Sequence, residues 1–182
     1  ERESPVDLTL VQGLQAGEKM DLTVQKAVEL GVGRIVPVST RRGVVRLEGE
    51  RAKRRAAHWR AVAVAACEQC GRNRLAEVAD PEDLPAWLNR PPAGTKPLRL
   101  RLDPGASLTL DTLPRPETTG AIELLIGAEG GLAAEEAELA RLAGFIAVRL
   151  GPRVLRTETA GLAALAAIQC LWGDFRGEAR HV

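Results

Sequence analysis

Two turns in the C-terminal third of the chain hold the residue types that could do chemistry. Residues 150–160 read LGPRVLRTETA, in which Arg153 and Arg156 precede a Thr-Glu-Thr sequence at the start of an expected helix. Cations, hydroxyls and a carboxylate gathered in one turn indicate catalysis or recognition of a polar ligand. The plainer alternative is an ordinary helix start with Thr157 as its N-cap.

A second turn upstream favours the functional interpretation. Residues 122–131 read IELLIGAEGG, a buried-strand pattern that runs into Gly127, Glu129 and two further glycines. Two strand ends, each followed by a tight turn and a helix, can face each other at the carboxyl edge of a parallel sheet. The two turns are therefore expected to border one crevice.

The earlier elements predict the sheet that would position these turns. Residues 6–14 read as a strand, residues 19–30 as a helix with Asp21 as candidate N-cap, and residues 34–40 as a second strand. This order begins a parallel α/β sheet. Further expected elements are a strand at 75–78, a short helix at 81–88, a loop at 89–96, a strand at 98–102, a loop at 114–120 and a helix at 133–142.

Two longer helices carry clearer signals. Residues 50–70 show an amphipathic stripe and end in the polar cluster EQCGR, where Gly71 can stop the helix. Arg72 is then free to reach a ligand, although a helix cap with a solvated arginine is an equal alternative. The last helix, from Ala160, is apolar on more than one face, which is typical of a helix buried on several sides or in a subunit interface.

A basic segment stands out from an almost neutral chain. The net charge is +1, yet residues 41–60 carry eight Lys or Arg against Glu48 and Glu50, a local charge of +6. This favours a phosphate-rich partner over the alternative of a solvated helix face. The sequence shows no membrane span and no signal peptide, so we expect a soluble cytoplasmic protein that does not bind membranes.

The cysteines do not indicate a metal site. Cys67 and Cys70 form a C-x-x-C pair, but no second pair stands at zinc-ribbon spacing, and His58 and His181 are poorly placed to complete a tetrahedral site. We expect no metal and three buried, reduced thiols, Cys170 being the third.

Four motifs in order closely resemble the RsmE family, ribosomal RNA methyltransferases that modify N3 of a uridine in small-subunit RNA. They are EKMDLTVQKAVELGV at 18–32, EQCGR at 68–72, IGAEGG at 126–131 and LGPRVLRTETA at 150–160. The last motif is long and specific, and the resemblance covers nearly the whole chain. Two positions depart from the family pattern: Ala128 stands for proline, and Ala133 for a serine or threonine whose loss as a helix cap costs about 1 kcal/mol.

The resemblance implies an α/β, parallel-sheet SPOUT fold with a C-terminal trefoil knot, working as a homodimer on 16S ribosomal RNA or the small ribosomal subunit. We expect residues 1–182 to be the SPOUT methyltransferase domain alone, because the family's N-terminal PUA-like RNA-binding domain is absent from this sequence. The implied cofactor is S-adenosyl-L-methionine. By position in the matched motifs, its binding set is Ile126, Gly127, Ala128, Gly131, Leu150, Gly151, Arg153, Leu155, Thr159 and Ala160.

Methylation at uracil N3 requires removal of a proton and stabilisation of the charge left on the ring. Arg72 and Arg156 are the candidate cations, with Arg153 third. The base could be Glu129 or Glu68, although Glu129 could instead brace its turn by accepting backbone N–H bonds.

Phosphate contacts would come from the basic segment, namely from Arg41, Arg42, Arg54 and Arg55. Two alternatives stay open. One is another SPOUT RNA methyltransferase, acting on a tRNA ribose or a guanine, and the other is a non-catalytic RNA-binding module of the same fold.

Overall fold

The computed structural model describes residues 2–91, 96–116 and 120–175. Parts of the loops expected at 89–96 and 114–120 lie outside these residues. The elements in chain order are β1 (Asp7–Gly13), α1 (Lys19–Glu29), β2 (Arg34–Ser39), α2 (Gly49–Cys70), β3 (Glu77–Val78), β4 (Glu82–Asp83), α3 (Leu84–Leu88), β5 (Leu98–Leu102), β6 (Leu108–Thr109), the 3₁₀ turn η1 (Leu110–Thr112), β7 (Ala121–Ile126), α4 (Ala134–Leu142), β8 (Ile146–Arg149) and α5 (Thr157–Leu171).

One parallel sheet organises the described residues. Its strand order is β3-β2-β1-β7-β5-β8-β6, and β4 also pairs with β2. On β1, Leu10 pairs with Ile35 of β2 on one side and with Leu124 of β7 on the other. The predicted parallel α/β architecture is confirmed. Because parallel strands point the same way, the turns after β7 and β8 leave the same edge of the sheet.

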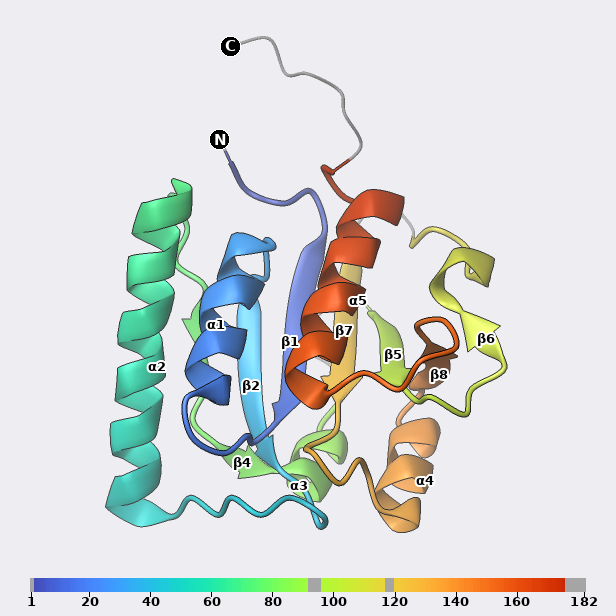
Figure 1. Ribbon diagram of the computed structural model, residues 1–182, viewed down its shortest axis with the longest axis horizontal. Helices are drawn as coiled ribbons and strands as arrows, with labels where there is room; N and C mark the ends of the chain where they lie inside the picture. The colour runs from blue at the N-terminus through green and yellow to red at the C-terminus, as the bar shows by residue number, and fades with distance from the viewer. Residues whose placement is uncertain (1, 92–95, 117–119, 176–182) are drawn as a thin grey trace, which may run out of the picture.

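Alternate residues of the strands feed two separate core layers. On β1, Leu8 and Leu10 belong to the layer that includes residues of α1, α2 and α5, whereas Val11 belongs to the layer with residues of α3 and α4. Figure 1 shows α1, α2 and α5 side by side in front of the sheet. Helices thus cover both faces, which explains why the strands read as nearly continuous apolar runs.

Asp21 lies inside α1 and links this helix to α2. The prediction that Asp21 is the N-cap was therefore wrong. α1 begins at Lys19, which places Asp21 inside the first turn on the side facing α2. Its carboxylate accepts a 2.9 Å hydrogen bond from the Trp59 indole N–H and lies 2.7 Å from His58 Nε2. The guanidinium of Arg55 approaches the same carboxylate at 3.4 Å.

Some helix boundaries also differ from those expected from the sequence. The helix expected at 81–88 begins only at Leu84, because the two residues before it pair with β2 as β4. Arg156, not Thr157, is the N-cap of α5. Gly71 ends α2 with a φ of 75°, in the left-handed region, as predicted. None of the helices in the described ranges combines the length and the apolar character that a membrane crossing needs.

Leu165→Ala should lower the free energy of unfolding by about 2–5 kcal/mol, because the Leu165 side chain is fully buried against the sheet and its loss leaves a cavity. Urea denaturation monitored by tryptophan fluorescence measures the change. Leu142→Ala is the matched control, since Leu142 is 67% exposed at the end of α4. Equal midpoints for the two variants would contradict this account of the α5 core.

Candidate functional site

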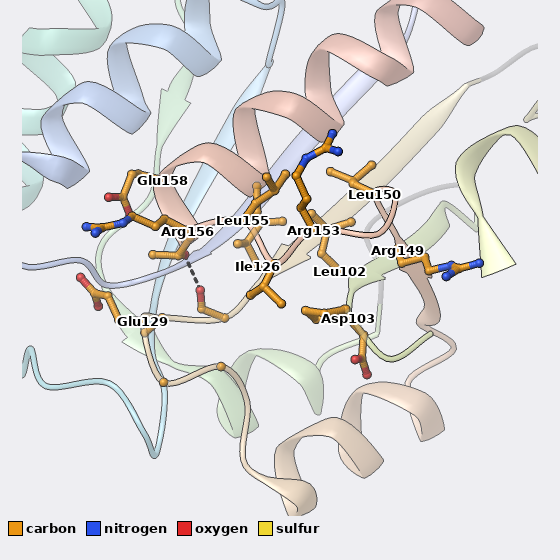
Figure 2. Close-up of a pocket in the computed structure, with 18 of the residues that line it drawn as sticks. Leu102, Asp103, Ile126, Glu129, Arg149, Leu150, Arg153, Leu155, Arg156 and Glu158 are labelled. Atoms are coloured by element: carbon orange, nitrogen blue, oxygen red, sulfur yellow. Dashed lines mark hydrogen bonds between the residues drawn. The ribbon is translucent and has the colours of Figure 1, made fainter. Parts of the chain in front are cut away.

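A cavity of about 570 Å³ opens at the carboxyl edge of the sheet, between the ends of β5, β7 and β8 and the start of α5. Both turns singled out in the sequence border it, as expected. Figure 2 shows Ile126 and Leu155 near its centre, with Leu102 beside them. The lining residues are Lys19, Leu102, Asp103, Pro104, Ile126, Gly127, Ala128, Glu129, Gly130, Gly131, Val148, Arg149, Leu150, Gly151, Arg153, Val154, Leu155, Arg156, Thr157, Glu158 and Ala160.

The turn after β7 is tightly packed against the end of β1. Gly131 has a φ of 67°, and its N–H donates a 2.8 Å hydrogen bond to the Ala128 carbonyl, which closes the turn. A Cβ added at Gly13 would collide with the backbone nitrogen of Ala128. A Cβ at Gly127 would lie 2.9 Å from the Gly131 carbonyl carbon. Glycine at these positions therefore fixes the wall of the cavity.

Gly13→Ala should weaken binding of a ligand in this cavity by about tenfold or more, because the added methyl group displaces the 127–131 turn and overpacking costs about 1–3 kcal/mol. Calorimetric titration of the variant with S-adenosylhomocysteine, the product form of the cofactor that the resemblance implies, measures the effect. Gly17→Ala is the comparison, since a Cβ there meets nothing within 4 Å although its φ is 61°. Unchanged affinity in Gly13→Ala would show that the turn tolerates displacement.

A buried polar relay connects β1, the β7 turn and α5. The Thr157 hydroxyl donates to the Gly127 carbonyl at 2.6 Å, drawn as the dashed line in Figure 2. The same hydroxyl accepts a 3.1 Å bond from Nε2 of Gln12, which is fully buried on β1. Thr157 therefore couples two walls of the cavity. Sequence reasoning did not select Gln12, although an amide in the middle of an apolar strand is a usable signal.

Charged groups gather on one side of the cavity. Glu129, Arg156 and Glu158 lie together there, across from Asp103 (Figure 2). Lys19, at the start of α1, bridges two of them: its Nζ lies 3.4 Å from Glu129 Oε1 and 3.5 Å from Glu158 Oε1. Lys19 and Glu158 were also not selected as site residues from the sequence.

Glu129 is held as an anion by its surroundings. Burial raises the pKa of its carboxyl, but hydrogen bonds from its own backbone N–H, from Lys19 and from the Ala16 N–H outweigh this and leave the pKa lowered. These contacts support the interpretation that Glu129 braces its turn. They favour the ionised form of its carboxyl.

Most of the residues expected to hold a cofactor meet in the cavity. Ile126, Gly127, Ala128, Gly131, Leu150, Gly151, Arg153, Leu155 and Ala160 line it, as do Arg156 and Glu129. Thr159 does not, because it lies on the exposed side of α5. The Arg156 side chain points toward the charged side of the cavity, whereas Arg153 points away from that side (Figure 2).

Arg72 and Glu68 are not brought to this cavity, in contrast to the expectation. Both sit at the C-terminal end of α2, and Glu68 is exposed there. Arg72 is buried: its guanidinium donates to Glu3 Oε2 at 2.7 and 2.9 Å and to the carbonyls of Val28 and Val32 at 3.1 and 2.7 Å. These partners lie just before β1, in α1 and just before β2, so Arg72 ties these segments of the fold together.

The basic residues occupy two places, and all are exposed except Arg55, which is half-buried. Arg54 and Arg55 lie on α2, where Arg55 also stacks over the Trp59 ring at 5.0 Å. Arg41 and Arg42 follow β2, and the Arg42 guanidinium donates to the Gly130 carbonyl at 3.5 Å. The loop of Arg41 and Arg42 therefore touches the β7 turn.

Glu136 compensates for the missing cap at Ala133. Its Oε2 accepts the Ala133 N–H at 2.9 Å, and its Oε1 accepts the Arg41 N–H at 2.7 Å. One buried carboxylate thus closes the start of α4 and holds the basic loop after β2. Alanine has no hydroxyl to accept a backbone N–H at this helix start, but the reciprocal bond of the capping box, from the Ala133 N–H to Glu136, is kept.

No group of three or more His, Cys, Asp or Glu side chains is placed to hold a metal ion within the described residues, and His181 lies outside them. None of the three cysteines forms a disulfide bond in the part of the chain that the structure describes. Cys67 is buried, but Cys170 is exposed on α5, so the prediction of three buried thiols was wrong. Cys170 is exposed because it lies on the outward face of α5.

Comparison with known proteins gives a consistent result. A family model described as an RNA methyltransferase domain matches residues 2–169. Ribosomal RNA small subunit methyltransferase E of Buchnera aphidicola subsp. Schizaphis graminum is 37% identical over 172 residues, which cover 94% of this chain and 68% of that protein. The crystal structure of the protein of that name from Neisseria gonorrhoeae, bound to S-adenosyl methionine, is 42% identical with a TM-score of 0.87, covering 96% of this chain and 70% of that one.

A more distant structure shares the fold alone. The SpoU methyltransferase AviRb of Streptomyces viridochromogenes is 16% identical, with a TM-score of 0.52 over 90% of this chain and 59% of that one. The expected parallel-sheet SPOUT fold is thereby confirmed. From the match over residues 2–169 and the 37% identity to a relative covered over 68% of its length, the chain belongs to the RsmE family of RNA methyltransferases.

Proposed function

We propose that this protein transfers a methyl group from S-adenosyl-L-methionine to N3 of a uridine in 16S ribosomal RNA. The observation that carries the proposal is the cavity itself, in which both motif turns of an RsmE-family chain enclose an apolar centre with a charged side. Such a combination suits a small ligand with a flat apolar part and an ionic part. The bound cofactor would supply the electrophilic methyl group.

The residues present fit that cofactor. Leu102, Ile126, Leu150 and Leu155 offer apolar contact for an adenine ring. The glycine turns at 127–131 and 150–151 let main-chain groups approach closely, which provides hydrogen bonds for ring and sugar edges. The residues proposed to hold the cofactor are the nine from the expected set that line the cavity, without Thr159.

The charged side of the cavity suits the proposed acceptor. Removing the N3 proton of uracil leaves negative charge on the ring oxygens, and preorganised cations stabilise it. Arg156 and Lys19 border the cavity on that side. Both can therefore lie beside the acceptor base, whereas Arg72 cannot within one chain.

Calorimetric titration with S-adenosylhomocysteine, the product form of the cofactor, is the first test. We expect stoichiometric binding by the wild-type chain, followed by methylation of small-subunit RNA with S-adenosylmethionine as donor. Binding without methylation of any RNA would favour a non-catalytic RNA-binding module. Methylation of a ribose hydroxyl or a guanine, found by mass spectrometry of the digested RNA, would favour another SPOUT activity.

A homodimer and the trefoil knot are part of the proposal. The outward side of α5 carries the partly exposed Leu162, Ala163 and Ala166, an apolar strip that a second copy could cover. The mass of the protein in solution tests the dimer. An RNA substrate and cysteines that form no disulfide bond among the described residues also suit action in the cytoplasm.

Neutralising two basic residues should flatten the salt dependence of RNA binding. Arg54→Gln with Arg55→Gln should reduce the slope of log affinity against log salt concentration by about 1–2, because each lost phosphate contact removes about one counterion from the exchange. Filter binding across a salt series measures the slope. Arg141→Gln is the control, since Arg141 lies on α4 and pairs with Glu138 at 2.7 Å. An unchanged slope in the double variant would locate the RNA elsewhere.

A further inference from the structure

Among the residues that the structure describes, three carboxylates line the cavity, namely Asp103, Glu129 and Glu158. Two of them already accept hydrogen bonds from neighbouring groups. Asp103 Oδ1 accepts the Gly105 N–H at 2.9 Å, and its Oδ2 accepts from the Arg101 guanidinium at 2.8 Å. Glu129 is engaged by backbone N–H groups and by Lys19. A proton acceptor for a bound substrate is therefore best sought at the third.

Glu158 differs from the other two because one of its oxygens is buried without a partner among the described residues. Its side chain is 16% exposed, and Oε2 is the unpartnered atom. The other oxygen lies 3.5 Å from Lys19 Nζ. A buried acceptor without a donor is costly, so the carboxylate would be stabilised by turning toward a ligand that brings an N–H group. Rotation about the last torsion of the side chain can turn either oxygen toward the cavity.

The geometry points to Glu158 as the group that accepts the N3–H of the target uracil and takes its proton. This inference rests on the proposed function. Uracil presents a donor at N3, whereas cytosine presents a lone pair there that would face the carboxylate unfavourably. Glu158 thereby selects uridine over cytidine as well as acting as the base.

The proton and electrons balance in one displacement. The N3–H bond breaks and its proton passes to the Glu158 carboxylate. The N3 electron pair forms the new bond to the methyl carbon, and the pair of the breaking C–S bond stays on sulfur, which becomes a neutral thioether. The charged groups that face Glu158 are Lys19 from α1, Arg156 from the preceding loop and Glu129 from the β7 turn. The two cations can offset the charge on the ring oxygens.

Glu158→Gln tests the role, with Glu138→Gln on the exposed side of α4 as the matched control. The substrate is a small-subunit RNA segment ligated with uridine, 6-azauridine or cytidine at the position that the wild-type protein methylates. We expect the single-turnover rate on uridine to fall about 10²–10⁴-fold in Glu158→Gln, with unchanged affinity for S-adenosylhomocysteine. Its rate should then rise with pH throughout, because only the ionised fraction of uridine reacts.

Two further readouts separate a base from a structural role. 6-Azauridine, whose N3 proton is more acidic, should restore most of the lost rate. In RNA competition with S-adenosylhomocysteine present, the wild-type protein should prefer uridine to cytidine by about tenfold, and the variant should lose that preference.

A wild-type rate and pH profile in Glu158→Gln would overturn the inference. So would a rate loss that 6-azauridine does not relieve. If Glu158→Gln fails to fold or to bind S-adenosylhomocysteine, Glu158→Asp is measured instead. The inference requires this variant to retain the wild-type pH profile and the uridine preference, and loss of either would overturn it. A wild-type protein that neither binds S-adenosylhomocysteine nor methylates RNA would instead defeat the proposed function.

Discussion

Arg156→Ala is expected to reduce methyl transfer by about 10²–10³-fold or more while leaving the protein folded. The guanidinium lies at the charged side of the cavity, and removing one preorganised donor from a developing anion costs about this much in rate. The backbone role of Arg156 survives in alanine, because its carbonyl accepts the Ala160 N–H at 2.8 Å whatever its side chain. Single-turnover methylation of small-subunit RNA measures the loss.

Three comparisons make the Arg156 result interpretable. The unfolding midpoint should stay at the wild-type value, and the affinity for S-adenosylhomocysteine should change little. Arg141→Ala on α4, which does not line the cavity, should keep the wild-type rate. Full activity in Arg156→Ala would remove Arg156 from the proposed chemistry and leave Lys19 as the cation beside the base.

Arg72→Ala is expected to destabilise the protein by about 3–5 kcal/mol, because it leaves the Glu3 carboxylate buried without its partner. The two side chains are only 6% and 10% exposed, and their closest atoms lie 2.7 Å apart. Arg72 also satisfies two carbonyls near the end of α1. Urea denaturation measures the loss, and Arg74→Ala serves as a neighbouring comparison. An unaltered denaturation midpoint in Arg72→Ala would show that the Arg72–Glu3 pair contributes nothing to stability.

The same pair gives the stability a pH dependence. Burial raises the pKa of Glu3, but hydrogen bonds from Arg72 and from the N–H groups of Arg74 and Asn73, with the Arg72 charge, leave it lowered. A carboxyl with a lowered pKa in the folded state stabilises that state above its unfolded pKa, and this is lost as pH falls through the folded value. The stability difference between wild type and Glu3→Gln should therefore shrink as the solution is acidified. A constant difference across acid pH would contradict this.

The sequence predicts the two turns well because glycine turns after apolar strands are local patterns. The nine matched residues around the cavity follow from them, since parallel strands bring their carboxyl ends to one edge. Arg72 could not be placed in this way. Its partner Glu3 lies 69 residues earlier in the chain, and no local pattern records that contact. Glu158 was visible in its motif, but only the burial of its free oxygen distinguishes it from the other carboxylates.

Placing β1 beside β7 has a consequence for how the protein is made. Asp7 pairs with Ala121, so the first strand lacks one of its two neighbours until more than a hundred later residues have been synthesised. Contacts between such distant residues slow folding, because a long loop must close before they form. The cavity needs the ends of β5, β7 and β8 and the start of α5 together. Cofactor binding is therefore expected only after α5 has been synthesised, which makes it a natural reporter of the folding of these elements in a nascent chain.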